Sequence, residues 1–145
     1  MIKSLKSGLA LGVMFVAGVC AGQWFEATPA AAQASGKVFE LRTYTSPPGK
    51  LNDLHARFRN HTLALFEKHG MTNVGYWVPA DPPLRDNTLI YIVSHDSREA
   101  AARSWKAFMS DPEWQKVRTA SEVNGRIVEK VDSVFMTAID YSKIK

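Results

Sequence analysis

The four histidines are the residues in this sequence that most directly suggest chemistry, because neutral imidazole binds metal ions and titrates near neutral pH. They are His55, His61, His69 and His95. No two of them have the i, i+4 spacing, with a third ligand nearby, that a metal site on a helix requires. A haem would need an axial histidine, for which His61 would be the best candidate, together with a large apolar cavity. We therefore expect neither a metal nor a cofactor.

Nucleophilic catalysis finds equally little support in the sequence. No Gly-x-Ser-x-Gly motif is present, and no serine has a context that would activate it. Cys20 is the only cysteine and lies close to the N-terminus. A chain cleaved after this residue would have no thiolate chemistry and no disulfide.

Aromatic and polar residues in the middle of the chain suggest a pocket for a small organic molecule, because such pockets have aromatic walls and a few polar groups. We predict the pocket between the helix expected over residues 50–69 and the sheet. The predicted lining is Tyr44, His61, Tyr76 or Trp77, and Trp105, with Arg42 or Arg59 at the mouth. His61 is the first choice for the polar contact because it lies at the edge of the apolar stripe of that helix. The alternative is that the aromatic residues only pack a core and His61 faces solvent.

The elements that would position these residues can be read from the periodicity of apolar residues. Alternation predicts strands over residues 37–44, 74–78, 89–95 and 126–141. Helical spacing predicts a long helix over 50–69 that ends at Gly70, a second helix that begins at Asp96, and a short third one capped by Asp111 before Pro112. The order βαββαβ, with an additional helical piece before the last strand, predicts an α+β, ferredoxin-like antiparallel sheet with helices on one face.

The uncovered face of that sheet predicts an assembly. The strand Leu89–Val93 has apolar residues at consecutive positions, so apolar side chains point to both faces of the sheet. In the last strand, Val134 and Met136 likewise point to the face opposite that of Phe135. A sheet with one face in water would alternate apolar with polar residues. We therefore expect a second subunit to cover the other face in a symmetric homodimer.

Four segments resemble the NIPSNAP family and together span about Lys37 to Tyr141. They are FELRTY at 39–44, HGMTNVGYW at 69–77, SWKAF at 104–108 with DPEW at 111–114, and VEKVDSVFM at 128–136. The resemblance implies a dimeric α+β barrel and a relationship to a superfamily that includes cofactor-free monooxygenases, haem-dependent enzymes and proteins of unknown role. Two functions stay open: a homodimeric domain that binds a small organic molecule, and a cofactor-free monooxygenase- or isomerase-like enzyme acting on a small aromatic or lipid-like substrate.

The first 34 residues have the order of a secretory signal peptide, followed by a NIPSNAP-like domain over 35–145. Lys3 and Lys6 precede an apolar stretch, and small residues follow around Ala32. We expect an exported protein, periplasmic or secreted; the alternative is that the segment is retained and anchors the protein in the membrane. The formal charge of +4 comes from basic residues that alternate with acidic ones, so nucleic acid is not an expected partner.

The signal-peptide interpretation predicts that the exported protein begins near Gln33 or Ser35, because cleavage follows a small-residue site. Mass spectrometry of the exported product measures this directly. An intact N-terminus recovered in the membrane fraction would instead support the anchor.

Overall fold

The computed structural model describes residues 36–145, so the predicted signal peptide or anchor within residues 1–34 lies outside the described residues. The strands are β1 Val38–Thr45, β2 Thr72–Trp77, β3 Thr88–His95 and β4 Lys130–Thr137. The helices are α1 Leu51–Arg57, α2 Leu63–Lys68, α3 Arg98–Ser110 and α4 Pro112–Ser121, with the π-helical η1 Phe58–Thr62 between α1 and α2 and the short 3₁₀ helix η2 Leu84–Asp86 before β3.

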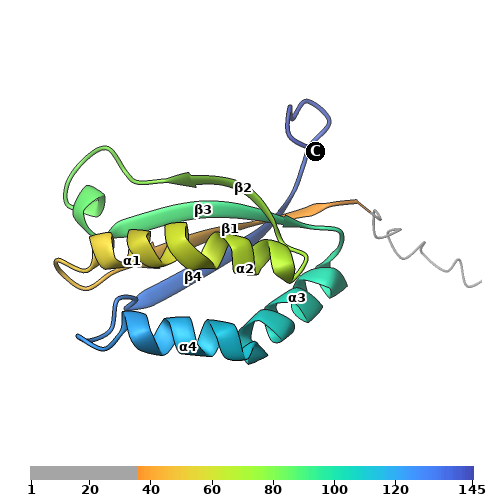
Figure 1. Cartoon of the computed structure of the whole chain (residues 1–145). Coiled ribbons are helices and arrows are strands. Elements are labelled where there is room, and N and C mark those ends of the chain that lie inside the picture. The colour runs from red at the N-terminus through yellow and green to blue at the C-terminus, as the bar shows by residue number, and fades with distance from the viewer. Residues whose placement is uncertain (1–35) are drawn as a thin grey trace, which may run out of the picture. The chain divides into compact units, whose positions relative to one another are not determined.

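The strands form one antiparallel sheet in the order β2-β3-β1-β4. The helices gather on one side of this sheet, with α1, η1 and α2 running as one continuous rod (Figure 1). The predicted ferredoxin-like α+β arrangement is therefore confirmed. No helix within residues 36–145 is long and apolar enough to cross a membrane.

The long helix is interrupted where the sequence predicts a regular one. Within η1 the backbone widens to π-helical geometry, and Thr62 Oγ1 donates a hydrogen bond of 3.2 Å to the carbonyl of Arg57 at the start of the wide turn. Single π-turns inside α-helices are frequent at functional sites. The helix ends as predicted, because Gly70 takes a φ of +75° that favours glycine.

The start of α3 differs from the prediction by one residue. Ser97, rather than Asp96, is the N-cap, and its Oγ accepts the backbone N–H of Ala100 at 3.1 Å. Both residue types are good caps, and Asp96 is exposed at the end of β3. Asp111 caps α4 as predicted by accepting the N–H of Glu113 at 2.7 Å, with Pro112 in the first turn.

The last strand is shorter than the predicted 126–141. At its start, Ile127 leaves the strand path and is fully buried in the core. At its end, Thr137 pairs with Val38, the first residue of β1, so the ladder has no further partner strand. The chain beyond Thr137 therefore leaves the sheet and ends in a loop away from the helices (Figure 1).

The two faces of the sheet have different surroundings. Every second side chain of each strand, such as Tyr44, Tyr76 and Tyr91, packs against the helices. The side chains between them point to the other side of the sheet, which we call the open face. Its apolar residues are Phe39 and Leu41 of β1, Trp77 of β2, Ile90 and Ile92 of β3, and Val134 and Met136 of β4, and the polar residues Thr43, Ser94 and Asp132 lie on the same face. No helix within residues 36–145 covers this face, and Val134 is 56% exposed.

The cap assignment makes a testable prediction. Ser97→Ala removes the acceptor for the first-turn N–H of Ala100, so it should lower the free energy of unfolding by about 1 kcal/mol. Asp96→Ala is the matched control and should change it by less than about 0.5 kcal/mol, as is usual for an exposed residue without such a role. Urea unfolding of both variants measures the difference. A larger loss in Asp96→Ala than in Ser97→Ala would restore Asp96 as the cap.

Candidate functional site

The carboxylate of Glu40 is the centre of a buried polar cluster on the helix side of β1. Glu40 is 1% exposed. Its Oε1 accepts Arg42 Nη1 at 2.7 Å and Ser133 Oγ at 2.6 Å, and its Oε2 accepts Trp105 Nε1 at 2.6 Å and His95 Nε2 at 3.1 Å. These donors come from β1, β4, α3 and β3, so one carboxylate joins three strands to a helix.

The surroundings of Glu40 keep it ionised. Burial alone would raise the pKa of this carboxyl, but the hydrogen bonds from His95, Ser133 and Trp105 and the charge of Arg42 hold its pKa at about 2. Because an ionised carboxylate only accepts hydrogen bonds, His95 must carry its proton on Nε2. His95 Nδ1 is then left with no hydrogen-bond partner within residues 36–145.

Arg42 lies between Glu40 and aromatic rings. Its guanidinium is 4.2 Å from the ring centre of Trp105 and 5.7 Å from that of Tyr44, which are cation–π distances. Burial would lower the pKa of Arg42, but nearby Tyr44, Tyr91 and Glu40 raise it on balance. Arg42 therefore stays charged and is held in a fixed position.

Aromatic rings occupy the centre of the space predicted for a ligand between the long helix and the sheet. A small pocket of about 200 Å³ remains at its edge, lined by His55, Phe58, Arg59, Leu63, Tyr76 and Leu89. Phe58 lies 5.7 Å from Tyr44, 5.8 Å from Tyr76 and 5.2 Å from Tyr91, measured between ring centres. Burial raises the pKa values of Tyr76 and Tyr91 above the usual phenol value, so both hydroxyls remain protonated. Rings from both layers interdigitate here, as in a packed core.

The structure brings four of the six predicted pocket residues to the helix side of the sheet and separates the other two from them. Arg42, Tyr44, Tyr76 and Trp105 lie on that side. Trp77 lies on the open face, where it is 50% exposed, and its indole sits so close over Gly75 that a Cβ there would be 2.5 Å from the ring. Successive residues of a strand point to opposite faces, so of the two alternatives only Tyr76 lies on the helix side.

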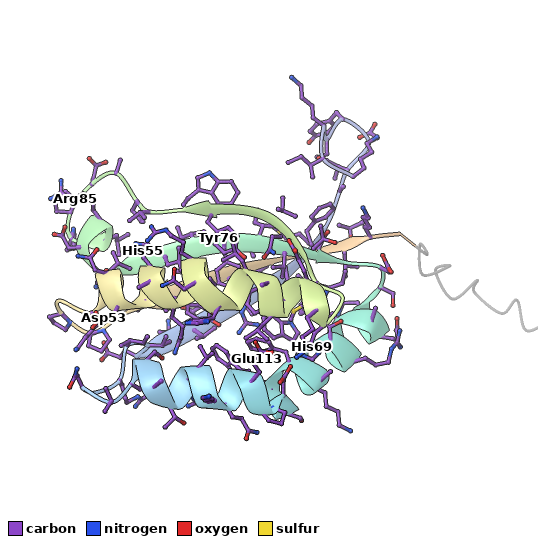
Figure 2. The ribbon with its side chains drawn as sticks, in the orientation of Figure 1. Asp53, His55, His69, Tyr76, Arg85 and Glu113 are labelled. Carbon is purple, nitrogen blue, oxygen red and sulfur yellow. The ribbon has the colours of Figure 1, made fainter. Side chains whose placement is uncertain are left out.

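His61 lies on a different side of the long helix from the one predicted. It is exposed and lines a groove of about 590 Å³ between α1–η1 and α4, which we call the α1–α4 groove. Asp53 on α1 and Glu113 on α4, both labelled in Figure 2, belong to its two walls. The volume is within the range of small-molecule sites, roughly 300 to 1,000 Å³.

Arg57 is the buried charge at the base of the α1–α4 groove. Its side chain is 4% exposed, and its Nη1 donates to Ser121 Oγ at 3.3 Å and to Glu122 Oε1 at 3.4 Å. The guanidinium lies 5.1 Å from the ring centre of Trp114. Neither Arg57 Nε nor Trp114 Nε1 has a hydrogen-bond partner within residues 36–145. Burial lowers the pKa of Arg57 more than Glu122 raises it.

His69 belongs to an ion cluster between α2 and α4. His69 Nε2 lies 2.7 Å from Asp111 Oδ2, and Lys68 Nζ lies 2.8 Å from the same oxygen. Lys68, His69 and the N–H of Glu113 lower the pKa of Asp111. This cluster ties the end of α2 to the start of α4. The described residues contain no group of three or more His, Cys, Asp or Glu side chains placed to hold a metal ion.

Two central residues of these sites, Glu40 and Arg57, were not predicted from the sequence. Glu40 and Arg42 are two apart in β1, so strand alternation places opposite charges on the same face, and this signal could have found the pair. Arg57 lies three residues after Leu54 and one before Phe58, on the apolar side of the helix. A charge at such a position signals a buried ion pair, but its partner Glu122 is 65 residues away.

The family model described as NIPSNAP matches residues 39–143. A NIPSNAP family protein with unknown function from Agrobacterium tumefaciens is similar in structure, with a TM-score of 0.66 and 19% identity over 77% of this chain and 96% of that one.

Two further structures extend the comparison. An uncharacterized NIPSNAP-like domain protein from Burkholderia xenovorans has a TM-score of 0.64 and 18% identity, over 74% of this chain and 90% of that one. SnoaB, a cofactor-independent oxygenase from Streptomyces nogalater, has a TM-score of 0.51 and 15% identity, over 76% of this chain and 99% of that one. No protein with a curated description matches the sequence. At these identities the structural likeness concerns the fold.

The Glu40 cluster predicts the effect of acid and of a neutral substitution. A pKa lowered to about 2 contributes stability that is fully present above the ordinary carboxyl pKa of 4.5 and is lost as the pH falls from about 5 towards 2. The difference corresponds to about 3 kcal/mol. Glu40→Gln should therefore destabilise the protein at pH 7 by about 3 kcal/mol or more, since it also leaves the partly buried Arg42 without its carboxylate.

Urea unfolding between pH 3 and pH 7 measures both effects, with Glu129→Gln as the matched control at an exposed glutamate. The control should keep the acid sensitivity of the wild type, whereas Glu40→Gln should flatten it. Equal stability of the two variants at pH 7 would contradict the role given to Glu40.

Proposed function

Because the chain belongs to the NIPSNAP family, we propose that its domain is exported, forms a homodimer through the open face of the sheet, and binds a small organic molecule. The observation that carries the proposal is the open face itself. Its central residues Leu41, Ile92 and Val134 are neighbours across three adjacent strands, and an exposed apolar surface of this kind marks an interaction site.

The composition of β1 supports a partner on the open face. In this strand the polar side chains Glu40 and Arg42 point to the helices, while Leu41, between them, points to the open face. Apolar side chains that face solvent bury no surface and therefore do not stabilise the strand, so an apolar face indicates that something covers it. A second copy supplies a matching apolar face by symmetry, which makes the contact self-complementary.

The α1–α4 groove supports the binding of a small molecule. It lies on the helix side of the domain, so a dimer joined through the open face would leave it accessible. Its volume of about 590 Å³ is sufficient for a small organic ligand. Export rests on the N-terminal sequence alone, in which Lys3 and Lys6 precede an apolar stretch.

An enzyme of the cofactor-free oxygenase or isomerase kind is the second candidate. The observation in its favour is the pair His95 and Glu40, since a carboxylate that binds one imidazole nitrogen leaves the other as a proton acceptor. The side chain of His95 is completely buried, so a substrate could reach it only if Trp105 or Phe135 moved. This burial makes the binding function the better supported of the two.

The homodimer makes a prediction for two substitutions on one strand. Val134→Asp places a charge at the centre of the proposed interface, where an unpaired buried charge costs several kcal/mol. Because Val134 is 56% exposed in a single subunit, the substitution should leave the fold intact and convert the dimer to a monomer. Val131→Asp, on the same strand but the helix-side parity and 40% exposed, is the control and should remain dimeric.

Light scattering at micromolar concentration, together with circular dichroism, measures mass and folding for the wild type and both variants. Ile92→Asp also lies on the open face but is half-buried within one subunit, so it tests folding as well as assembly. A wild type that is a folded monomer, or a Val134→Asp variant that remains a dimer, would contradict the proposed interface.

A further inference from the structure

We propose that the α1–α4 groove binds an organic anion whose negative head group pairs with Arg57 and whose apolar body lies along α4. This inference rests on the proposed ligand-binding function and assigns it a place and a chemical class.

The first reason is the incomplete pairing of Arg57. A guanidinium has five N–H donors, and a charge this deeply buried is costly unless it is paired and hydrogen-bonded. The two contacts of Arg57, at 3.3 and 3.4 Å, are long for hydrogen bonds to a charged group, and its Nε has no partner within residues 36–145. A carboxylate in the groove would complete this pairing, because it accepts hydrogen bonds from two guanidinium nitrogens at once.

The second reason is the balance of charge along the groove. The two acidic residues of its walls each have a lysine partner. Asp53 lies 3.2 Å from Lys50, and Glu113 lies 3.0 Å from Lys68, which also pairs with Asp111 at 2.8 Å. Lys116, which also lines the groove, has no ion-pair or hydrogen-bond partner among the described residues. Lys116 and the unpaired Nε of Arg57, whose Nη1 lies 3.4 Å from Glu122, therefore favour a negative group in the groove.

The third reason is the position of η1. The wide turn begins directly after Arg57, and Thr62 closes it by donating a hydrogen bond to the Arg57 carbonyl. Two residues of the same turn, Asn60 and His61, line the groove. The π-turn thus places the polar side chains of Asn60 and His61 on the same wall as the charged Arg57. Such turns are frequent at functional sites.

The opposite wall sets the shape of the ligand. Val117 and Ala120 of α4 and Val123 beyond it give that wall an apolar surface. A molecule with one anionic group and a flat apolar body, such as an arene carboxylate, matches both walls. A strongly polar dianion or a neutral sugar does not.

Calorimetric titration of the full-length protein tests the assignment with benzoate, 2-naphthoate and 4-biphenylcarboxylate, each beside its neutral primary amide. We expect the carboxylates to bind at least fivefold more tightly than the amides. Lys116→Gln should weaken carboxylate binding about threefold. Lys106→Gln, which removes the same charge from the exposed face of α3, should leave it unchanged.

Arg57→Lys keeps the charge but removes the planar pair of donors, so it should weaken carboxylate binding tenfold or more without the same effect on the amides. Its melting temperature shows whether the variant is folded; if it is not, the comparison of Lys116→Gln with Lys106→Gln decides.

Equal binding of carboxylates and amides, or equal effects of the two lysine substitutions, would overturn the inference and leave small-molecule binding intact. Failure of all six probes to bind the folded protein would overturn both, while the dimer is judged separately by its mass.

Discussion

The carboxylate of Glu40 is the interaction on which the arrangement of this domain most depends. It accepts hydrogen bonds from Arg42, His95, Trp105 and Ser133, which lie on β1, β3, α3 and β4. A buried carboxylate is tolerated only when such donors surround it, so each of these elements must keep its position for the others to be stable. The position of Arg42 against the rings of Trp105 and Tyr44 follows from the same constraint, and so does the closure of the aromatic layer between the long helix and the sheet.

This constraint explains why the two faces of the sheet differ. Alternate side chains of β1 point to opposite faces of the sheet. Glu40 and Arg42 point to the helices because the partners of Glu40 lie there, so Leu41 between them points to the open face. The proposed homodimer covers that face, and the proposed ligand occupies the α1–α4 groove on the helix side. Assembly and binding would therefore use different surfaces, and a change in one would not require a change in the other.

The sequence predicted the parts of the fold that depend on local signals. The apolar stripe with Leu54 and Phe58, the cap at Asp111 and the turn at Gly70 each specify an element by neighbouring residues alone. The sites depend on contacts between distant residues, and there the predictions were incomplete. Arg57 meets Glu122 across 65 residues, and Glu40 meets Ser133 across 93. His61 was placed beside the sheet because the stripe has an edge on each side, and periodicity alone does not tell which edge faces the sheet and which faces α4.

Glu40 remains ionised in the interior because four hydrogen-bond donors surround its carboxylate. The most direct test is the titration of its side-chain carboxyl carbon, followed by ¹³C NMR in the folded protein as the pH is lowered. The structure predicts that this signal does not move until the pH approaches about 2 or the protein unfolds. A transition in the folded state at or above the ordinary value of 4.5 would show that burial outweighs the donors, and would contradict the account.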